Sequence, residues 1–419
     1  MKRILNNFEK IFIIFLYMGP ILDLIAGIML HYNYNITISS IVRLSFMFFS
    51  IIYLIFKVKN KKINIFLSLI FAYFIIFFVT ILITKGTPAI SYEIKNLFTT
   101  YYFIIMLITL ASLYKNKKFN TYNLFIIYLI YLFFVFIPNI FNIGFNSYYE
   151  SKEGSAGLFK SANVIGSILS ILLPIIIINI KKINIRLIIL FIINLYVIFS
   201  IGTKVPVLSF ILVLGINILY YLIYLAKKHN YKILIIILIP TILITALSIV
   251  IFPKTSFYKN IVIHINYLEK KDNGHISTNH IIDHFIFSER LTFEEKTRKA
   301  YNKSTMLEKV FGIGYIENYS TDKVRLKTVE IDYFDIFYRH GIIGFIIFFT
   351  PIIIVLHGII KNIKYKKKEK LNIILSICLI FILALFQGHI LVTPSNSIFA
   401  ALILALSYNN SYSFKNKLK

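Results

Sequence analysis

The sequence predicts an all-α polytopic membrane protein with about 12 transmembrane helices and one long extracytoplasmic loop that contains short helices. Hydrophobic residues make up 58% of the 419 residues, and the mean hydropathy is +0.78, which excludes a soluble globular domain. About 20 apolar residues suffice to cross the hydrocarbon core as a helix, and apolar runs of about that length follow one another along the chain. The long polar interval 253–336 is the third observation. We therefore expect helices 1–9 in 1–252, the loop in 253–336, and helices 10–12 with a tail in 337–419.

Each expected span is an apolar run bounded by charged or polar residues. The first run follows Met1-Lys2-Arg3 and has no small-residue cleavage site after it, so we predict a retained span rather than a signal peptide. The single cysteine, Cys378, lies inside an apolar run, which excludes disulfides and thiolate metal sites as organising features. In chain order the spans are 10–30, 37–56, 63–84, 96–114, 121–143, 158–180, 184–201, 204–226, 232–252, 337–360, 371–390 and 395–410.

The distribution of the basic residues predicts the topology. The net charge is +27, yet the loops expected on one side hold 25 of the 45 Lys and Arg residues and only two of the 18 acids. This asymmetry follows the positive-inside rule, so we place both termini in the cytoplasm of a bacterial-type cell. The basic loops would lie beside anionic membrane lipid, which explains the positive net charge. Nucleic acid is therefore not expected as a partner. The cytoplasmic pieces are 1–10, 57–62, 115–120, 181–186, 227–232, 361–370 and 411–419.

Two charged residues lie within the first spans. Asp23 falls in the first span and Arg43 in the outer third of the second. A charge at the centre of a membrane helix costs about 2.5–3.5 kcal/mol on insertion scales, so it normally faces a partner or a cavity. Either Asp23 and Arg43 pair with each other or snorkel, or Arg43 lines an outward-facing cavity for an anion.

Three of the outer connections that precede the long loop have charged residues in or next to them. The connection 85–95 has charges without a recognisable spacing, and we expect a short link or an interfacial helix. The segment from Gly157 to Gly166, with Lys160 and Asn163, opens the sixth span. The tight turn Thr203-Lys204 places a cation at the membrane surface, where Lys204 either snorkels or contacts a phosphate as a point charge.

The first half of the long loop is rich in histidine and ends at Arg290. His280 and His284 share a helical spacing that can bind zinc, but no glutamate or thiolate completes a site, so we assign no metal and no cofactor. Thr292 and Glu295 form a capping-box pattern that predicts a helix over about 292–306. Arg290 would then lie just before the helix and point into a cavity.

The second half of the loop contains glycines and acids. Gly312 and Gly314 predict a turn with positive φ or close backbone approach. Glu330, Asp332 and Asp335 follow, and Arg339 lies at the start of the tenth span. These acids either line a solvated face and pair with arginines, or they serve a catalytic site at the outer rim of the membrane.

Four blocks in a fixed order carry a resemblance to a known family. They are 157–166, Thr203-Lys204, Ser288-Glu289-Arg290, and Gly312-Ile313-Gly314 followed by charges and Gly341-Ile342-Ile343-Gly344. Together they resemble the O-antigen ligase/polymerase family of bacterial integral membrane glycosyltransferases over about 157–350. Ligases of that family carry a His-Asn pair where this sequence has Glu330-Ile331, and the usual Ser-Arg of the tight turn is Thr203-Lys204 here. The acidic version is similar to members that polymerise capsular or other secreted glycans.

The resemblance implies a reaction and its residues. The substrate would be oligosaccharide repeat units on a lipid (undecaprenyl) diphosphate, joined into a surface polysaccharide outside the cytoplasmic membrane without a metal. Glu330, or as second choice Asp332, would accept the proton of the attacking hydroxyl. Arg290 would bind the diphosphate, with Lys204, Arg339 and Arg43 as further cations and Asn163, Lys160, Gly312, Gly314 and Asp335 in supporting positions. Partners would be the lipid-linked substrate and a chain-length regulator or other polysaccharide-assembly proteins.

Three other functions compete with polymerisation. An O-antigen-type ligase would transfer the finished glycan to an acceptor. A flippase for lipid-linked oligosaccharide would carry charges along a central cavity, whereas here the unpaired charges lie near one rim. An accessory subunit of an envelope complex would tolerate changes at Arg290 and Glu330. A nucleotide-sugar transferase is disfavoured, because the polar loop is expected on the side that lacks nucleotides.

Overall fold

The protein is all-helical in the part of the chain that the structure describes. A computed structural model describes residues 5, 7–34, 38–113, 120–147, 153–180, 185–229, 252–271, 287–288, 290–316, 328–362 and 367–413. Within these ranges nine helical stretches are long and apolar enough to cross a membrane. They are α2 (Phe8–His31), α3 (Ile38–Tyr53) continued by a π-helical turn (Leu54–Val58), α4 (Lys61–Lys85), α5 (Ile90–Leu113), α6 (Thr121–Ile140), α7 (Ala162–Asn179), α9 (Lys204–Lys227), α15 (Asp332–Asn362) and α16 (Lys367–Phe386).

The remaining helices are shorter or less apolar. They are α8 (Ile185–Ile201), α11 (Ser256–Lys271), α13 (Arg290–Lys303), α14 (Met306–Phe311) and α17 (Pro394–Ser413). The predicted all-α polytopic class is confirmed, and helices form at each of the predicted spans that the structure describes. The predicted span 232–252 lies outside the described residues, except for Phe252 in a short 3-10 turn.

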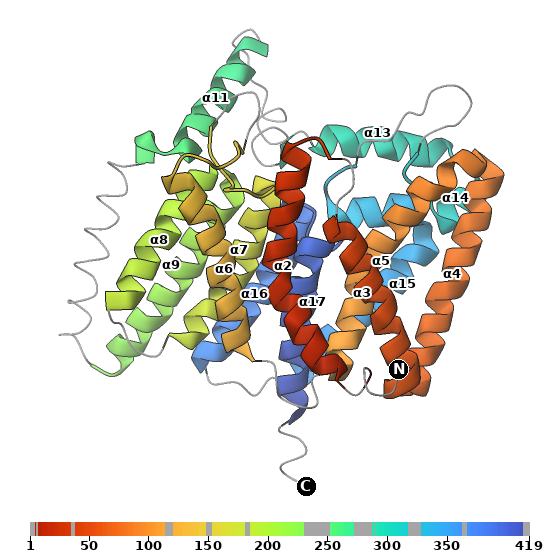
Figure 1. Ribbon diagram of the computed structural model, residues 1–419, viewed down its shortest axis with the longest axis horizontal. Coiled ribbons are helices and arrows are strands. Elements are labelled where there is room, and N and C mark those ends of the chain that lie inside the picture. The colour runs from red at the N-terminus through yellow and green to blue at the C-terminus, as the bar shows by residue number, and fades with distance from the viewer. Residues whose placement is uncertain are drawn as a thin grey trace. The chain divides into compact units, whose positions relative to one another are not determined.

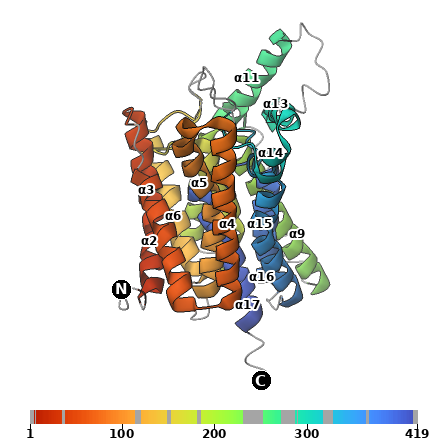
Figure 2. The same ribbon diagram turned by 90° about the vertical axis from the view of Figure 1, so that its right-hand side faces the viewer.

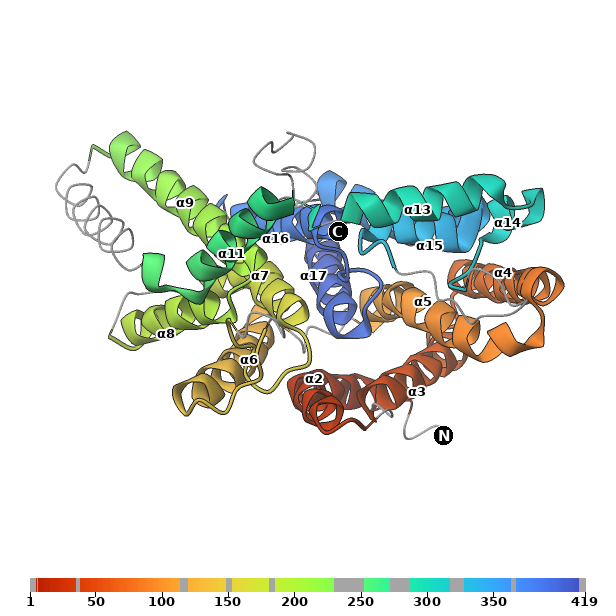
Figure 3. The ribbon, with the colours of Figure 1, turned by 90° about the horizontal axis from the view of Figure 1, so that it is seen from above.

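The chain divides into two compact units. One unit, 1–22 with 36–123 and 277–419, contains α3 to α5 and α13 to α17, and the other, 23–35 with 124–276, contains α6 to α9 and α11. In the first unit α17 packs closely along α5 and also against α15 (Figure 3). Its residues Ile398 to Leu406 are buried almost all round, as expected for a helix in the middle of a bundle. α17 is therefore the central helix of this unit.

The long helices α3, α4 and α5 of the first unit run in alternating directions, so their connections lie at two ends. The turn at Lys59-Asn60, between the π-helical turn and α4, lies at one end, and the 3-10 turn 87–89, between α4 and α5, lies at the other (Figures 1 and 2). Helices α13 and α14, the start of α15 and the start of α17 share the end of the 87–89 turn. Within the first unit, the segments with Arg290 and with Glu330, which were predicted to carry the chemistry, therefore lie at this end, opposite the basic turn at 57–62.

Candidate functional site

The segment 328–331 before α15 is shaped by one buried carboxylate. Asp335, in the first turn of α15, accepts hydrogen bonds from the backbone N–H groups of Val329 at 3.0 Å and Glu330 at 2.9 Å. This arrangement holds Glu330 at φ 61°, a left-handed conformation that non-glycine residues rarely adopt. The carboxylate of Asp335 thereby fixes the position from which the Glu330 side chain leaves the backbone.

A second buried carboxylate fixes the turn between α16 and α17. Asp332 accepts backbone hydrogen bonds from His389 at 2.7 Å, Ile390 at 2.9 Å and Leu391 at 2.7 Å, and it is fully buried. Three N–H donors on one carboxylate make a strong, charge-assisted anchor. Asp332, the second choice as proton acceptor from the sequence, therefore has both oxygens occupied by the backbone of 389–391.

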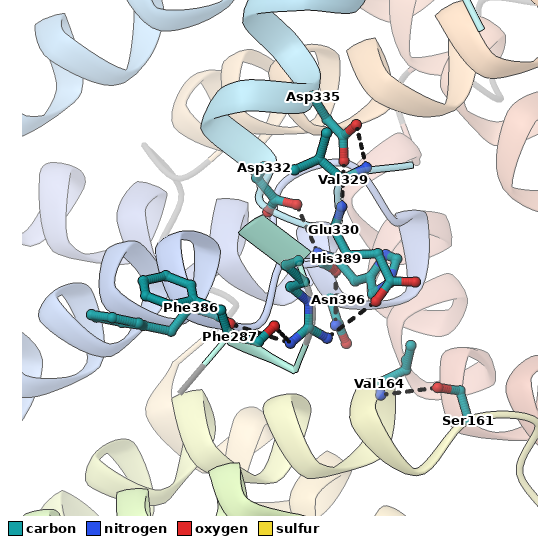
Figure 4. A network of polar contacts seen from close by, with 11 residues as sticks. Ser161, Val164, Phe287, Val329, Glu330, Asp332, Asp335, Phe386, His389 and Asn396 are labelled. Carbon is teal, nitrogen blue, oxygen red and sulfur yellow. Dashed lines mark hydrogen bonds and ion pairs between the residues drawn. The ribbon is translucent and has the colours of Figure 1, made fainter. Parts of the chain in front are cut away.

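These two anchors bring Glu330 and His389 together (Figure 4), and Arg290 forms an ion pair with Glu330. Arg290 Nη2 lies 3.1 Å from Glu330 Oε2, and His389 Nε2 lies 3.7 Å from Glu330 Oε1. The side chains of Glu330 and His389 are each 29% exposed, whereas Arg290 is buried. A carboxylate with one cationic partner on each oxygen is thus reachable from outside the protein.

The charges of the cluster set the protonation of its two exposed members. Burial by itself raises the pKa of Glu330, but the hydrogen bond and charge of His389 and the charge of Arg290 outweigh burial and lower that pKa to about 2. Burial likewise favours neutral His389, yet the contact with Glu330 raises the pKa of the imidazole above its ordinary value. Glu330 alone is therefore a weak base at neutral pH, whereas the imidazole of His389 binds a proton more strongly than an isolated histidine does.

Arg290 is oriented by its own hydrogen bonds. Its Nη1 donates to the carbonyls of Phe287 at 3.1 Å and Phe386 at 3.4 Å, and its Nε has no hydrogen-bond partner among the described residues. A guanidinium held in a fixed orientation is the kind of group that donates hydrogen bonds to phosphate oxygens. Arg290 and Glu330, two candidate site residues from the sequence, thus form an ion pair, while Glu289 lies outside the described residues.

The segment with Gly312 and Gly314 contacts a break in α15. Gly341, at φ 66° and ψ −175°, interrupts the helix, and the carbonyls freed before it accept from Ile313 N–H and Gly314 N–H at 3.1 Å each. Gly312 at φ 114° and Gly314 at φ 65° confirm the predicted positive φ. A Cβ on Gly312 would lie 2.1 Å from the carbonyl oxygen of Arg339, so close backbone approach is confirmed as well.

Arg339 lies in a buried network behind this contact. Its Nη1 donates to the carbonyl of Gly314 at 3.1 Å, and its Nε is 3.7 Å from Asp335. Lys85 and Glu93, expected on a simple connection, are buried in the same network, where Lys85 donates to the carbonyl of Ile313 and Glu93 accepts from Tyr315 N–H at 2.7 Å. Arg339 and Asp335 therefore support the cluster through the backbone, and diphosphate binding by Arg339 stays a prediction.

Arg43 lies at the same end of the first unit as the start of α17. It is buried, donates to Ser39 and to Ser395 at 3.1 Å, and reaches the carbonyl of Gly19 at 3.4 Å. In the second unit Asp23 accepts a hydrogen bond from Tyr131 at 2.6 Å. The predicted role of Arg43 in an anion cavity stays a prediction.

The predicted residues of the second unit lie at the starts of two helices. Ser161 caps α7 by accepting from Val164 N–H at 3.4 Å, with Lys160 exposed just before the cap and Asn163 half-buried in the first turn. Thr203 is buried at the N-cap of α9, whose first residue is Lys204. The segment from Gly157 to Gly166 thus opens a membrane helix, as predicted, and the phosphate contact of Lys204 stays a prediction.

Several helix boundaries differ from the sequence predictions, and two of these differences bear on the site. The predicted helix 292–306 begins at Arg290 and ends at Lys303, and a capping box forms instead at Thr305 and Glu308, where it opens α14. The predicted span 371–390 ends at Phe386, because Gly388 at φ 69° and His389 at φ 62° cannot continue a helix. The sequence prediction missed His389 for this reason, although Gly388 and Pro394 are recognisable stop and start signals.

No group of three or more metal-ligating side chains occurs in the described part of the chain. His275, His280 and His284 lie outside the described residues.

The fold and this cluster define an integral membrane protein whose charged site lies among the loops at one end of its helices. Residues 5–279 and 276–409 match the family described as O-antigen ligase like membrane proteins. Because the match spans most of the chain, the protein belongs to this family, and a role in glycan assembly at a membrane follows. No curated protein matches the sequence.

Proposed function

We propose that this protein polymerises oligosaccharide repeat units carried on a lipid (undecaprenyl) diphosphate, on the outer face of the bacterial cytoplasmic membrane. The observation that carries the proposal is the ion pair between Arg290 and Glu330, partly exposed beside His389. The donor of such a reaction leaves as an anion, and its acceptor is a hydroxyl that must lose a proton. The cluster offers a fixed cation for the first event and ionisable groups for the second.

In this reaction, Arg290 and the Glu330 side of the site have different roles. As the anomeric C–O bond to the diphosphate breaks, the leaving oxygen gains the electron pair, and the positive charge of the Arg290 guanidinium stabilises the new negative charge. The acceptor hydroxyl oxygen forms the new bond to the anomeric carbon and releases its proton to the Glu330 side of the site. Lys204 and Arg43 are further cations in this proposal.

An acidic residue at position 330 favours polymerisation over ligation. The first test is a gel of lipid-linked and total surface glycan from a deletion strain that carries wild-type protein, Glu330→Gln or Arg290→Lys. We expect single repeat units to accumulate on lipid and long chains to fall by at least about 10²-fold in both variants, the loss typical of removing one preorganised group.

Glu295→Gln and Arg298→Lys are matched controls, because both side chains are at least half exposed on α13. Both should restore the wild-type ladder. Long chains that remain on lipid and never reach their final acceptor in the deletion strain would identify a ligase. A wild-type ladder from both Glu330→Gln and Arg290→Lys would leave the protein with an accessory role.

A further inference from the structure

His389 lies in a turn that is held in place by hydrogen bonds and by a close backbone contact. Its backbone N–H is held by Asp332 at 2.7 Å, and its carbonyl accepts from the side-chain amide of Asn396 at 2.9 Å. The preceding Gly388 packs so closely on Glu330 that a Cβ there would lie 2.1 Å from the Glu330 carbonyl oxygen. The turn that carries His389 and the segment that carries Glu330 are thus locked together by their backbones.

The imidazole itself is held less tightly than its backbone. Its Nε2 faces Glu330 Oε1 at 3.7 Å, and no hydrogen bond of Nδ1 is found among the described residues. When the proton is on Nε2, facing the carboxylate, Nδ1 is left as the basic nitrogen. A carboxylate that orients an imidazole and stabilises its protonated form is a recurrent arrangement in hydrolases and transferases.

Glu330 and His389 differ in how readily they accept a proton, and this difference gives them different roles. A base works best when the pKa of its conjugate acid is near the working pH. The carboxylate of Glu330, flanked by Arg290 and His389, has its pKa lowered to about 2 and holds a proton weakly. The imidazole beside it accepts a proton far more readily at neutral pH.

We propose that His389 is the catalytic proton acceptor of this site. Glu330 is then the positioning residue that orients the imidazole of His389 and stabilises its protonated form. The inference rests on the proposed polymerisation. In the step, the acceptor hydroxyl oxygen bonds to the anomeric carbon, and its proton passes to Nδ1 of His389. The anomeric bond to the diphosphate breaks, and its electron pair leaves with the diphosphate oxygen beside Arg290.

The charged groups that face His389 determine how it titrates. Glu330 and Asp332, with Asp335 behind them, favour the imidazolium, whereas Arg290 opposes it. The net result is that the pKa of His389 is raised. Removing the charge of Glu330 must therefore lower the pKa of His389, and a role that is only structural would not produce this shift in a pH–rate profile.

The test uses full-length protein in lipid nanodiscs and lipid-linked repeat units extracted from the deletion strain. The rate of chain elongation at saturating substrate should rise with pH along a limb that belongs to His389. In Glu330→Gln the midpoint of this limb should move to lower pH, with a lower maximum rate. In His389→Asn the limb should vanish and kcat should fall at least about 10²-fold while KM changes little.

Asparagine is chosen because it tolerates the left-handed backbone of position 389. His357→Asn, an exposed position on α15, is the matched control and should keep the wild-type profile. Titration of isotope-labelled histidines by NMR, assigned with His389→Asn, should show the same downward shift of the His389 midpoint in Glu330→Gln.

The outcomes separate the two proposals. If wild-type protein does not elongate the substrate, polymerisation is wrong and the role of His389 falls with it. If wild-type protein elongates it and His389→Asn keeps the wild-type kcat and pH limb, the role of His389 alone is wrong. An unchanged midpoint in Glu330→Gln, by rate or by NMR, would overturn the assignment of Glu330 as the group that charges His389.

Discussion

At the scale of single residues, Glu330 is the most constrained group of the site. Its backbone has a rare left-handed conformation that Asp335 stabilises, and its two carboxylate oxygens face a guanidinium and an imidazole. A non-glycine residue in this conformation costs of order 1–3 kcal/mol, so surrounding contacts must hold it there. Strain of this kind clusters at functional sites, which supports the placement of the reaction at Glu330.

The same residues predict how stability depends on pH. The pKa of Glu330 is lowered from 4.5 to about 2, so its contribution is complete above about 4.5 and is lost as pH falls toward 2. The pKa of His389 is raised from 6.5, so its contribution is complete below 6.5 and is lost as pH rises through the raised value. Purified wild-type protein should therefore exceed Glu330→Gln in Tm most clearly between about pH 4.5 and 6.5.

Thermal unfolding of both proteins in one detergent over pH 3 to 9 measures this difference. Glu295→Gln is the control, because its exposed pair with Lys299 should add little at any pH. A Tm difference that is constant across the pH range would contradict the ion-pair account.

At the scale of elements, the contact between residues 312–314 and the break in α15 positions the site. The break frees the carbonyls of Tyr338 and Arg339, and the extended segment 312–314 fills the gap with its own N–H groups. Tyr73 adds a third contact by donating to the carbonyl of His340 at 3.0 Å. Since α15 begins with Asp332 and Asp335, any shift of its first half would move both anchors of the cluster.

Gly341→Ala should therefore disrupt both stability and activity. Gly341 lies at φ 66°, and a Cβ there would be 2.5 Å from Gly312 N and from the Val310 carbonyl oxygen. The left-handed conformation alone penalises alanine by about 1–3 kcal/mol, and the backbone contacts cannot yield easily. We expect a clearly lower Tm in detergent and a strong loss of elongation.

Gly215 on α9 provides the matched substitution. No atom lies within 4 Å of the position of its missing Cβ, so Gly215→Ala should be neutral or stabilising by about 0.5–1 kcal/mol. Equal Tm values for Gly341→Ala and wild type would show that the break in α15 tolerates a side chain and does not fix the site.

Helix positions could be predicted from the sequence much better than the polar contacts. Spans such as α4 and α9 follow from run length alone, because hydrocarbon thickness sets how many apolar residues are needed. The contacts of Lys85, Glu93 and His389 join segments far apart in the chain, and neither spacing nor charge pattern encodes such pairing. Arg290 was found in the block Ser288-Glu289-Arg290 and Glu330 at the position of the family's His-Asn pair, and both residues lie in the long polar interval.

At the scale of the whole molecule, charge and chemistry are segregated along the helices of the first unit. The basic turn with Lys59 lies at one end, whereas α13 and the turns around the cluster lie at the other. Positively charged loops are retained in the cytoplasm during insertion. The end with the cluster should therefore face outward, where lipid-linked sugars are assembled in the proposed reaction.

Cysteine labelling tests this orientation directly. Cys378 is the single cysteine of the chain, so Cys378→Ala gives a background for Glu295→Cys on α13 and Lys59→Cys at the opposite end. Both positions are exposed. A membrane-impermeant maleimide should label Glu295→Cys in intact spheroplasts, and it should label Lys59→Cys only after the membrane is permeabilised. The reverse pattern would place the cluster in the cytoplasm and exclude the proposed outer-face polymerisation, because the site would then face the compartment that holds nucleotide sugars.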